Sequence, residues 1–317
     1  MKQTLFVITA FLLSFNLFSQ EQPNLLSSSK ITTIGYWNIG DKAIYHVTKS
    51  EMTTKGSSTQ PVKQTSESYD LEITVVDSTE HSYILEMKYL NGSTENEEIQ
   101  DIMNNLKTST VIRYQTDEMG SYEKILNIPE LQKNFKLILD ELNKRLTAKL
   151  TPEESKAFSI RMNEMTVQLS KPENIEVLYL QDILGMHSYY GIELNLNKPQ
   201  EVDMEFPCFA NITVPGTGKM VLQSINKAKD IATFSMTSKP NKEELKKYMK
   251  VFFGQLFPES KEKVPVDQMS IDFENKEKLV IRLSDGWMES IEASQTAFVS
   301  DSKEKIKKVT SKQFTRK

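Results

Sequence analysis

The sequence predicts an α+β protein. Two related β-β-α-β-β units are expected to form one extended, curved antiparallel sheet, and a helical block between them is expected to cover one face. Three observations support this: alternating apolar residues over positions 69–89, a similar run 149 residues later, and three helical patterns in between. The predicted units span residues 35–128 and 200–317, and the helical block spans residues 129–199.

The clearest element is a β-hairpin over residues 69–89. Apolar residues fall on every second position of two runs, which a polar turn at residues 77–80 separates. This period is typical of half-buried strands that pack one face on a core. The apolar positions are Tyr69, Leu71, Ile73 and Val75 in the first run, and Tyr83, Leu85, Met87 and Tyr89 in the second.

A similar hairpin follows at a constant offset of 149 residues, so that residues 71–87 match residues 220–236. A charged helical run follows each hairpin, and two further strands are expected after each helix. We interpret the match as an ancient duplication, and common hairpin patterning is the alternative. The expected helices are residues 93–107 and 241–257, and the expected strands are residues 109–114, 121–126, 269–273 and 278–283.

The N-terminus has the pattern of a secretory signal peptide over residues 1–19. Lys2 precedes an apolar run from Leu5 to Phe18, and Ser19 is a small residue at the expected cleavage position. The run is shorter than the about 20 residues of a spanning helix, so no transmembrane span is expected in the mature chain. An N-terminal membrane anchor is the alternative. No cysteine lies near the cleavage position for a lipid anchor, and export to the periplasm or the extracellular space is expected.

The region before the first hairpin is predicted to contain one strand between two irregular segments. Residues 20–34 show little periodicity and are expected to form a linker. Ala43, Tyr45 and Val47 alternate with less apolar residues and predict a strand that pairs with the hairpin. The polar segment 49–68 contains Gly56 and Pro61 and is expected to be a mobile or disordered loop.

Three helices are expected in the block at residues 129–199. Each has a proline near its first turn, which is a favoured position because the missing N–H has no partner there. These prolines are Pro129, Pro152 and Pro172. The third helix is apolar on nearly every side and is expected to be buried.

The last unit is expected to consist mainly of strands. Residues 201–206, 287–293 and 303–314 have strand patterns. The last of these is rich in lysine, which fits either an edge strand guarded by charge or a surface for anionic lipid head groups.

Composition and cysteine content exclude several classes of function. The chain has 38% hydrophobic and 26% charged residues, with 39 basic against 43 acidic side chains, so nucleic acid is not an expected partner. Cys208 is the only cysteine, and its apolar neighbours predict a core residue with a raised thiol pKa. The three histidines lie far apart, so neither a metal nor another cofactor is expected.

Two groups of residues are candidates for catalysis, and carboxylates form the first. Glu201, Asp203 and Glu205 share one face of a predicted strand, a pattern that suits calcium binding, acid–base chemistry or a solvated face. His187 and Ser188 are adjacent, and Ser188 lacks the glycines that flank a hydrolase nucleophile. No catalytic residue is therefore predicted.

Methionine is frequent at positions that the strand and helix patterns place inward. Its flexible side chain adapts to varied apolar ligands, and ordinary core filling is the alternative. The residues expected to line an apolar site are Leu85, Met87, Met186, Met220, Phe234 and Met236.

Three short stretches resemble uncharacterised exported proteins of Gram-negative bacteria. They are Gly40-Asp41-x-x-x-Tyr45-x-Val47, the hairpin from Val75 to Tyr83, and Tyr114-x-Thr116-Asp117-x-x-Gly120-x-Tyr122. The resemblance covers about the first third of the mature chain, and it implies no activity. The predicted architecture is also similar to that of exported lipid carriers, in which helices cap a curved sheet over an apolar cavity.

The sequence therefore favours an exported, non-catalytic binding protein. Its ligand is expected to be an apolar small molecule or lipid, or a cell-envelope protein, held between the sheet and the helices. A carboxylate-dependent hydrolase that uses the strand at Glu201–Glu205 or Asp285 is the alternative, and a structural protein of the cell envelope is a further one.

Overall fold

The computed structural model describes residues 29–317, apart from residues 57, 59, 95–99, 102–109, 210–211, 257–265 and 301–304. The predicted signal peptide at residues 1–19 and most of the helix expected at residues 93–107 lie outside the described residues.

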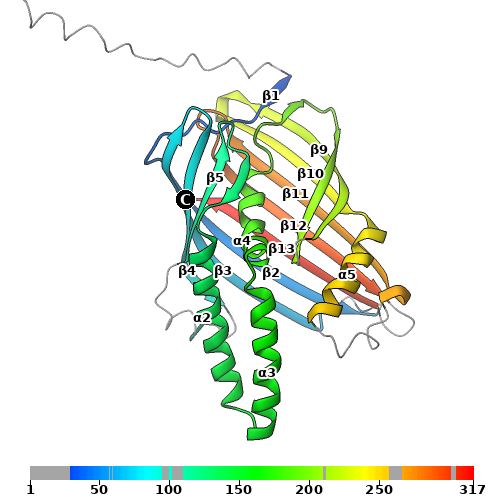
Figure 1. The fold of residues 1–317 in the computed structure, drawn as a ribbon. Coiled ribbons are helices and arrows are strands. Elements are labelled where there is room, and N and C mark those ends of the chain that lie inside the picture. The colour runs from blue at the N-terminus through cyan, green and yellow to red at the C-terminus, as the bar shows by residue number, and fades with distance from the viewer. Residues whose placement is uncertain are drawn as a thin grey trace, which may run out of the picture.

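In the described part, 11 strands form one antiparallel sheet (Figure 1). In spatial order they are β6 (Tyr122–Ile125), β5 (Val111–Asp117), β4 (Ser82–Thr94), β3 (Lys63–Thr79), β2 (Lys42–Lys55), β13 (Lys305–Arg316), β12 (Met288–Ser300), β11 (Ser270–Arg282), β10 (Ile231–Pro240), β9 (Ile212–Asn226) and β8 (Gln200–Cys208).

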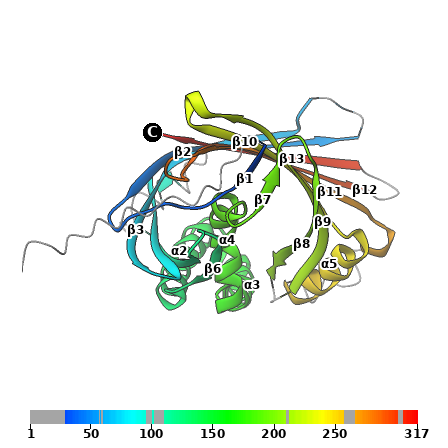
Figure 2. The same cartoon turned by 90° about the horizontal axis from the view of Figure 1, so that it is seen from above.

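The helices lie on one side of this curved sheet, as Figure 2 shows. Helices α2 (Ile128–Thr147), α3 (Pro152–Leu169) and α4 (Pro172–His187) form the predicted block, and we call these three helices the cover. Helix α5 (Lys242–Leu256) contacts β9 and β11 farther along the same face. The predicted α+β class, with helices on one face of a large antiparallel sheet, is confirmed.

Local signals explain where the cover helices begin. All three have a proline in the first turn. In α3, the Thr151 side chain accepts a hydrogen bond from the Glu154 backbone N–H, and the Glu154 carboxylate accepts one from the Thr151 N–H. This capping box satisfies two backbone donors that lack helical partners.

Strand β13 lies in the middle of the sheet, so its interpretation as an edge strand is wrong. It pairs with β2 on one side and with β12 on the other, and Phe314 lies opposite both Val47 and Ile291. Inward-facing lysines of β13 are paired with carboxylates, as Lys308 is with Glu51. The C-terminal strand thus joins the two predicted units into one sheet.

The polar segment 49–68 forms a hairpin extension where a mobile loop was expected. Strand β2 continues to Lys55 and β3 begins at Lys63, with Ser50 opposite Ser66. Gly56 has φ 64°, a left-handed conformation that glycine adopts readily in a turn. This part of the hairpin lies beyond the apolar core, so its strands show no apolar alternation.

Two other expectations are also corrected. The strands predicted at residues 269–273 and 278–283 are one strand, β11, in which Asn275 pairs with Ser238 and Gln295 instead of forming a turn. Within the predicted linker 20–34, residues 30–32 form β1 (Lys30–Thr32), which pairs with β7 (Glu193–Asn195).

Both predicted hairpins are present, but their registers differ. Leu85 lies opposite Val75 in β3–β4, whereas Phe234, at an offset of 149 residues from Leu85, lies opposite Leu222 in β9–β10. Leu222 corresponds to Ile73 under that offset, so the two registers differ by two residues. The duplication therefore stays a prediction.

Candidate functional site

The inner face of the sheet, which faces the helices, carries all the residues predicted from the strands to line an apolar site. Two of them lie on β4 and three on β9 and β10, with five strands of the sheet between the two groups, and Met186 lies on α4. All six are at most 6% exposed and belong to one apolar cluster. They are Leu85, Met87, Met186, Met220, Phe234 and Met236.

Next to this apolar region, the inner face becomes polar. The row that contains Met236 and Met220 continues across the sheet through Glu277, Ala293, Lys312 and Lys49. Lys49 forms ion pairs with Glu67 at 2.9 Å and with Glu51 at 3.7 Å. The methionine-rich part of the inner face is therefore bordered by charged side chains.

Helix α4 places one carboxylate, that of Asp182, against this border. Lys312 of β13 forms an ion pair with Asp182 Oδ1. The hydroxyls of Tyr69 on β3 and Tyr89 on β4 donate hydrogen bonds to Asp182 Oδ2 at 3.3 and 2.8 Å. We call these four residues the Asp182 cluster. The Asp182 side chain is 10% exposed, so three donors from the sheet hold a nearly buried anion that belongs to the cover.

The aromatic rings around Lys312 shape the cluster further. Its ammonium nitrogen lies 5.5 Å from the ring centroid of Tyr69 and 5.0 Å from that of Phe314. These distances allow cation–π attraction. Burial, followed by the charge of Asp182, raises the pKa of the Tyr69 and Tyr89 hydroxyls, so both remain donors at neutral pH.

A second carboxylate of the inner face is held by a tyrosine at the end of α4. The Tyr189 hydroxyl donates a hydrogen bond to Glu277 Oε2 at 2.7 Å. Burial raises the pKa of Glu277 above its usual range, and the hydrogen bond from Tyr189 opposes this shift.

An aromatic cluster fills the end of the core beyond α4. Trp37 and Trp287 stack with their ring centroids 4.7 Å apart, and Tyr190 and His187 contact Trp37 edge to face. His187 is fully buried, with Nε2 2.9 Å from the Tyr114 hydroxyl and Nδ1 2.8 Å from the carbonyl of Gly120. Because a carbonyl only accepts, Nδ1–H donates to Gly120 and Nε2 accepts from Tyr114. Both ring nitrogens therefore have structural partners.

We expect His187 to make the stability of the protein depend on pH. Burial lowers the pKa of His187 from 6.5 to about 4, so the unfolded chain binds a proton more readily between these values. The contribution of the neutral His187 to stability is then fully present above pH 6.5 and is lost as the pH falls towards 4. The free energy of unfolding should drop by about 2 kcal/mol between pH 7 and pH 5 on account of this group alone.

Urea unfolding of the wild type and of His187→Gln at both pH values measures that contribution. The variant is less stable at pH 7, but its stability should change less between the two pH values. Equal pH dependence in both proteins would contradict the buried neutral imidazole.

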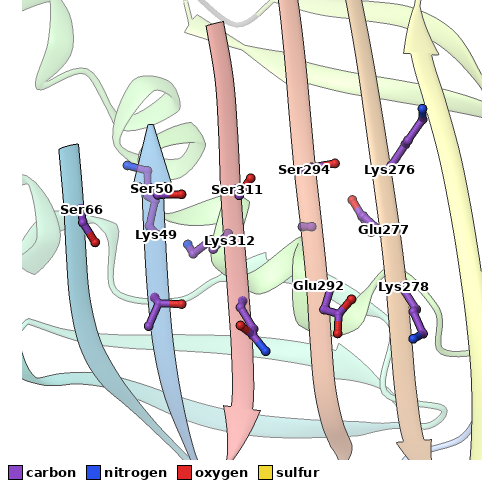
Figure 3. Close-up of a pocket in the computed structure, with 13 residues that line it drawn as sticks. Lys49, Ser50, Ser66, Lys276, Glu277, Lys278, Glu292, Ser294, Ser311 and Lys312 are labelled. Carbon is purple, nitrogen blue, oxygen red and sulfur yellow. The ribbon is translucent and has the colours of Figure 1, made fainter. Parts of the chain in front are cut away.

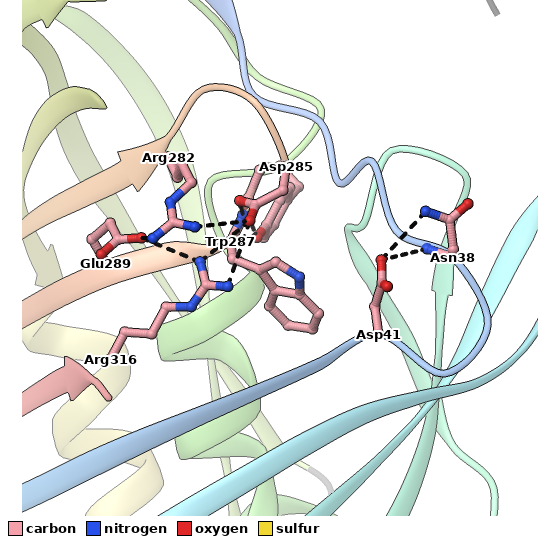
Figure 4. Close-up of polar contacts among 9 residues, drawn as sticks. Asn38, Asp41, Arg282, Asp285, Trp287, Glu289 and Arg316 are labelled. Carbon is pink, nitrogen blue, oxygen red and sulfur yellow. Dashed lines mark hydrogen bonds and ion pairs between the residues drawn. The ribbon is translucent and has the colours of Figure 1, made fainter. Parts of the chain in front are cut away.

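Figure 4 shows the ion pairs beside Trp287. Asp285 lies between Arg282 and Arg316 at 3.5 and 3.4 Å, and both arginines also contact Glu289. Asp285 Oδ1 also accepts a hydrogen bond from the Trp287 backbone N–H at 2.9 Å. Asp285 thus fixes the turn before β12. These contacts give Asp285 a structural role.

The other predicted carboxylates extend into solvent. Glu201, Asp203 and Glu205 are exposed along the edge strand β8, which confirms the solvated face. In the described part of the chain, no group of three or more His, Cys, Asp or Glu side chains is arranged to hold a metal ion. Cys208 is half-buried, and burial raises the pKa of its thiol, as expected.

A trough of about 590 Å³ crosses the outer face of the sheet, opposite the helices (Figure 3). Strand alternation directs serine hydroxyls from four neighbouring strands into it, with lysine and glutamate side chains beside them. None of the six residues predicted to line an apolar site borders this trough. The serines are Ser66, Ser50, Ser311 and Ser294.

Sequence patterns identified the apolar residues of the inner face but missed the Asp182 cluster. One signal was available, because Asp182 is a single acidic residue within the apolar run from Leu178 to Leu184. Lys312 lies two residues before the apolar Phe314 on the same predicted strand and therefore shares its inward face, but its partner Asp182 lies 130 residues away in the sequence.

The described helices include none that is both long and apolar enough to cross a bilayer. No family model matches the sequence. No curated protein matches it either. Among solved structures, lipovitellin, described as showing lipid–protein interactions, aligns with 88% of this chain at 9% identity and a TM-score of 0.40. The alignment spans 25% of the lipovitellin chain.

Proposed function

We propose that this chain is an exported, non-catalytic binding protein that holds an apolar ligand between the inner face of the sheet and the cover. The observation that carries the proposal is the composition of this interface. A methionine-rich apolar surface is covered by a helix whose contact with the central strands includes a charged pair, Asp182 with Lys312.

The apolar part of the interface suits a ligand that inserts between two protein surfaces. Burying one large apolar side chain is worth about 1.5–3 kcal/mol, so an empty open state is costly. An inserted apolar ligand keeps these side chains out of water on both surfaces. Met87 and Met220 on the sheet and Met186 on α4 are flexible enough to repack around ligands of different shape.

The charged part of the interface lowers the cost of opening. A buried ion pair is often no more stabilising than apolar side chains of similar volume, because both charges lose hydration when they are buried. When the cover separates from the sheet, Asp182 and Lys312 regain that hydration. The two charges therefore favour a cover that can leave the sheet without unfolding it.

Export is the second part of the proposal, and the N-terminal pattern at residues 1–19 supports it. A soluble carrier of apolar molecules has a clear use outside the cytoplasm, where such molecules must cross water between membranes. Cleavage near Ser19 would give a mature chain that starts at or near Gln20.

Mass spectrometry of the mature protein tests both parts. The full chain is expressed with its own N-terminus, the exported fraction is purified without detergent, and the protein is extracted with organic solvent. We expect a mature N-terminus near Gln20 and an apolar molecule in a molar amount close to that of the protein.

A mock purification from cells without the gene controls for carried-over lipid. Absence of any enriched apolar molecule, together with no uptake of added lipid, would contradict the binding proposal. Retention of the intact N-terminus in the cytoplasmic fraction would contradict export.

A further inference from the structure

We propose that the ligand carries an anionic head group on its apolar tail, and that this head group replaces the Asp182 carboxylate in the cluster. This inference rests on the proposed function and adds the chemical class of the ligand. Lys312, Tyr69 and Tyr89 all belong to the sheet, whereas the anion that they hold belongs to the cover. The sheet therefore has an anion site of its own, which the closed cover fills with Asp182.

The donor set fits a carboxylate or a phosphate. Lys312 contacts one oxygen of Asp182, and the two tyrosine hydroxyls contact the other. Hydrogen bonds to a charged acceptor are about twice as strong as those between neutral groups. Lys49, the Cα partner of Lys312 on β2, is already paired with Glu67 and Glu51, so Lys312 is the cation that the site offers to a head group.

The position of the site relative to the apolar surface fits an amphipathic ligand. Tyr89 lies two residues from Met87 on β4, and Lys312 lies two residues from Phe314 on β13. A head group at Lys312 would therefore have the apolar row of Phe314, Ile291 and Phe234 directly beside it. Opening of the cover removes Asp182 from the site and uncovers this row, so the head group and the tail become accessible together.

Three ligands with the same tail test the inference: oleate, oleyl phosphate and oleyl alcohol. Affinities are measured by native mass spectrometry or by displacement of a fluorescent fatty acid. We expect the wild type to bind at least one of the two anions about tenfold or more tightly than the alcohol. A difference of this size corresponds to the free energy of a hydrogen bond to a charged group. Stronger binding of oleate assigns a carboxylate head, and stronger binding of oleyl phosphate assigns a phosphate head.

The variants change the preference for the anion over the alcohol in opposite directions. Lys312→Met should remove most of the preference, and Tyr89→Phe should reduce it several-fold. Asp182→Asn should increase it, because the head group then no longer competes with the Asp182 carboxylate for Lys312. Lys278→Met, which removes a lysine from the outer face of β11, should leave the preference unchanged. Circular dichroism confirms that each variant is folded.

The outcomes separate this inference from the proposed function. If the alcohol binds as tightly as both anions, or if Lys312→Met and Tyr89→Phe leave the preference intact, the anion site is wrong while the apolar binding site stands. If none of the three ligands binds the wild type and no apolar molecule copurifies, both proposals are wrong.

Discussion

Deletion of residues 305–317 is expected to abolish cooperative folding. The deletion removes β13, and with it the pairing partner of both β2 and β12 and the buried side chain of Phe314. The whole free energy of unfolding of a domain is about 5–15 kcal/mol, so loss of a central strand exceeds what the fold can tolerate. The exposed edges of β2 and β12 should also promote aggregation.

Addition of a peptide with the sequence of residues 305–317 should restore the sheet. Circular dichroism and urea unfolding of the truncated chain, with and without the peptide, measure the effect. A peptide with Phe314→Asp serves as the matched control and should not restore folding. If the truncated chain alone unfolds in one transition with the midpoint of the full chain, the sheet does not depend on β13 to join β2 to β12.

Replacement of Lys312 by methionine should have the second largest effect. The variant leaves the Asp182 carboxylate nearly buried without its cation, and breaking such a pair on one side costs about 3–5 kcal/mol. Because 21% of the Lys312 side chain is exposed, we expect a loss near the lower end of that range, about 3 kcal/mol. Urea unfolding at pH 7 measures this change.

Two further variants show whether the loss comes from the unpaired charge. The double variant Lys312→Met/Asp182→Leu replaces both charges and should recover most of the lost stability. Lys308 lies on the same strand as Lys312 and forms a more exposed ion pair with Glu51 of β2. Lys308→Met breaks this pair and should lower the free energy of unfolding by less than about 1 kcal/mol. Equal losses for Lys312→Met and Lys308→Met would show that Asp182 is not confined beneath a closed cover.

The elements that could be predicted from the sequence are those whose signals are local. Alternation of apolar residues identified the β3–β4 hairpin, and the prolines at residues 129, 152 and 172 identified the starts of the cover helices. Each of these signals depends on residues close together in the chain, because helix hydrogen bonds and tight turns join near neighbours.

Strand pairing between residues far apart in the sequence explains most of the expectations that the structure corrects. Nothing near Phe314 in the sequence indicates that it lies opposite Val47, so an edge strand was one of the two interpretations of this lysine-rich segment. The segment 49–68 was expected to be a loop because its strands are polar on both faces, yet their backbones pair fully. Asn275 suggested a turn, but partners on both sides keep β11 extended there.

The candidate site was predictable on its apolar side only. Burial follows from alternation, so Met87, Phe234 and Met236 could be placed inward from the sequence. The Asp182 cluster brings together residues from β3, β4, α4 and β13, and only the tertiary structure shows which charge meets which.

Hydrogen–deuterium exchange of the ligand-free protein tests most directly whether the cover can leave the sheet. If it can, amides of α2–α4 should exchange together through an opening whose free energy is below that of global unfolding, while β2, β12 and β13 stay protected. Added oleate, or whichever ligand copurifies, should slow this opening. If α4 and the central strands exchange only together, at the free energy of global unfolding, the cover does not open and the proposed binding site is contradicted.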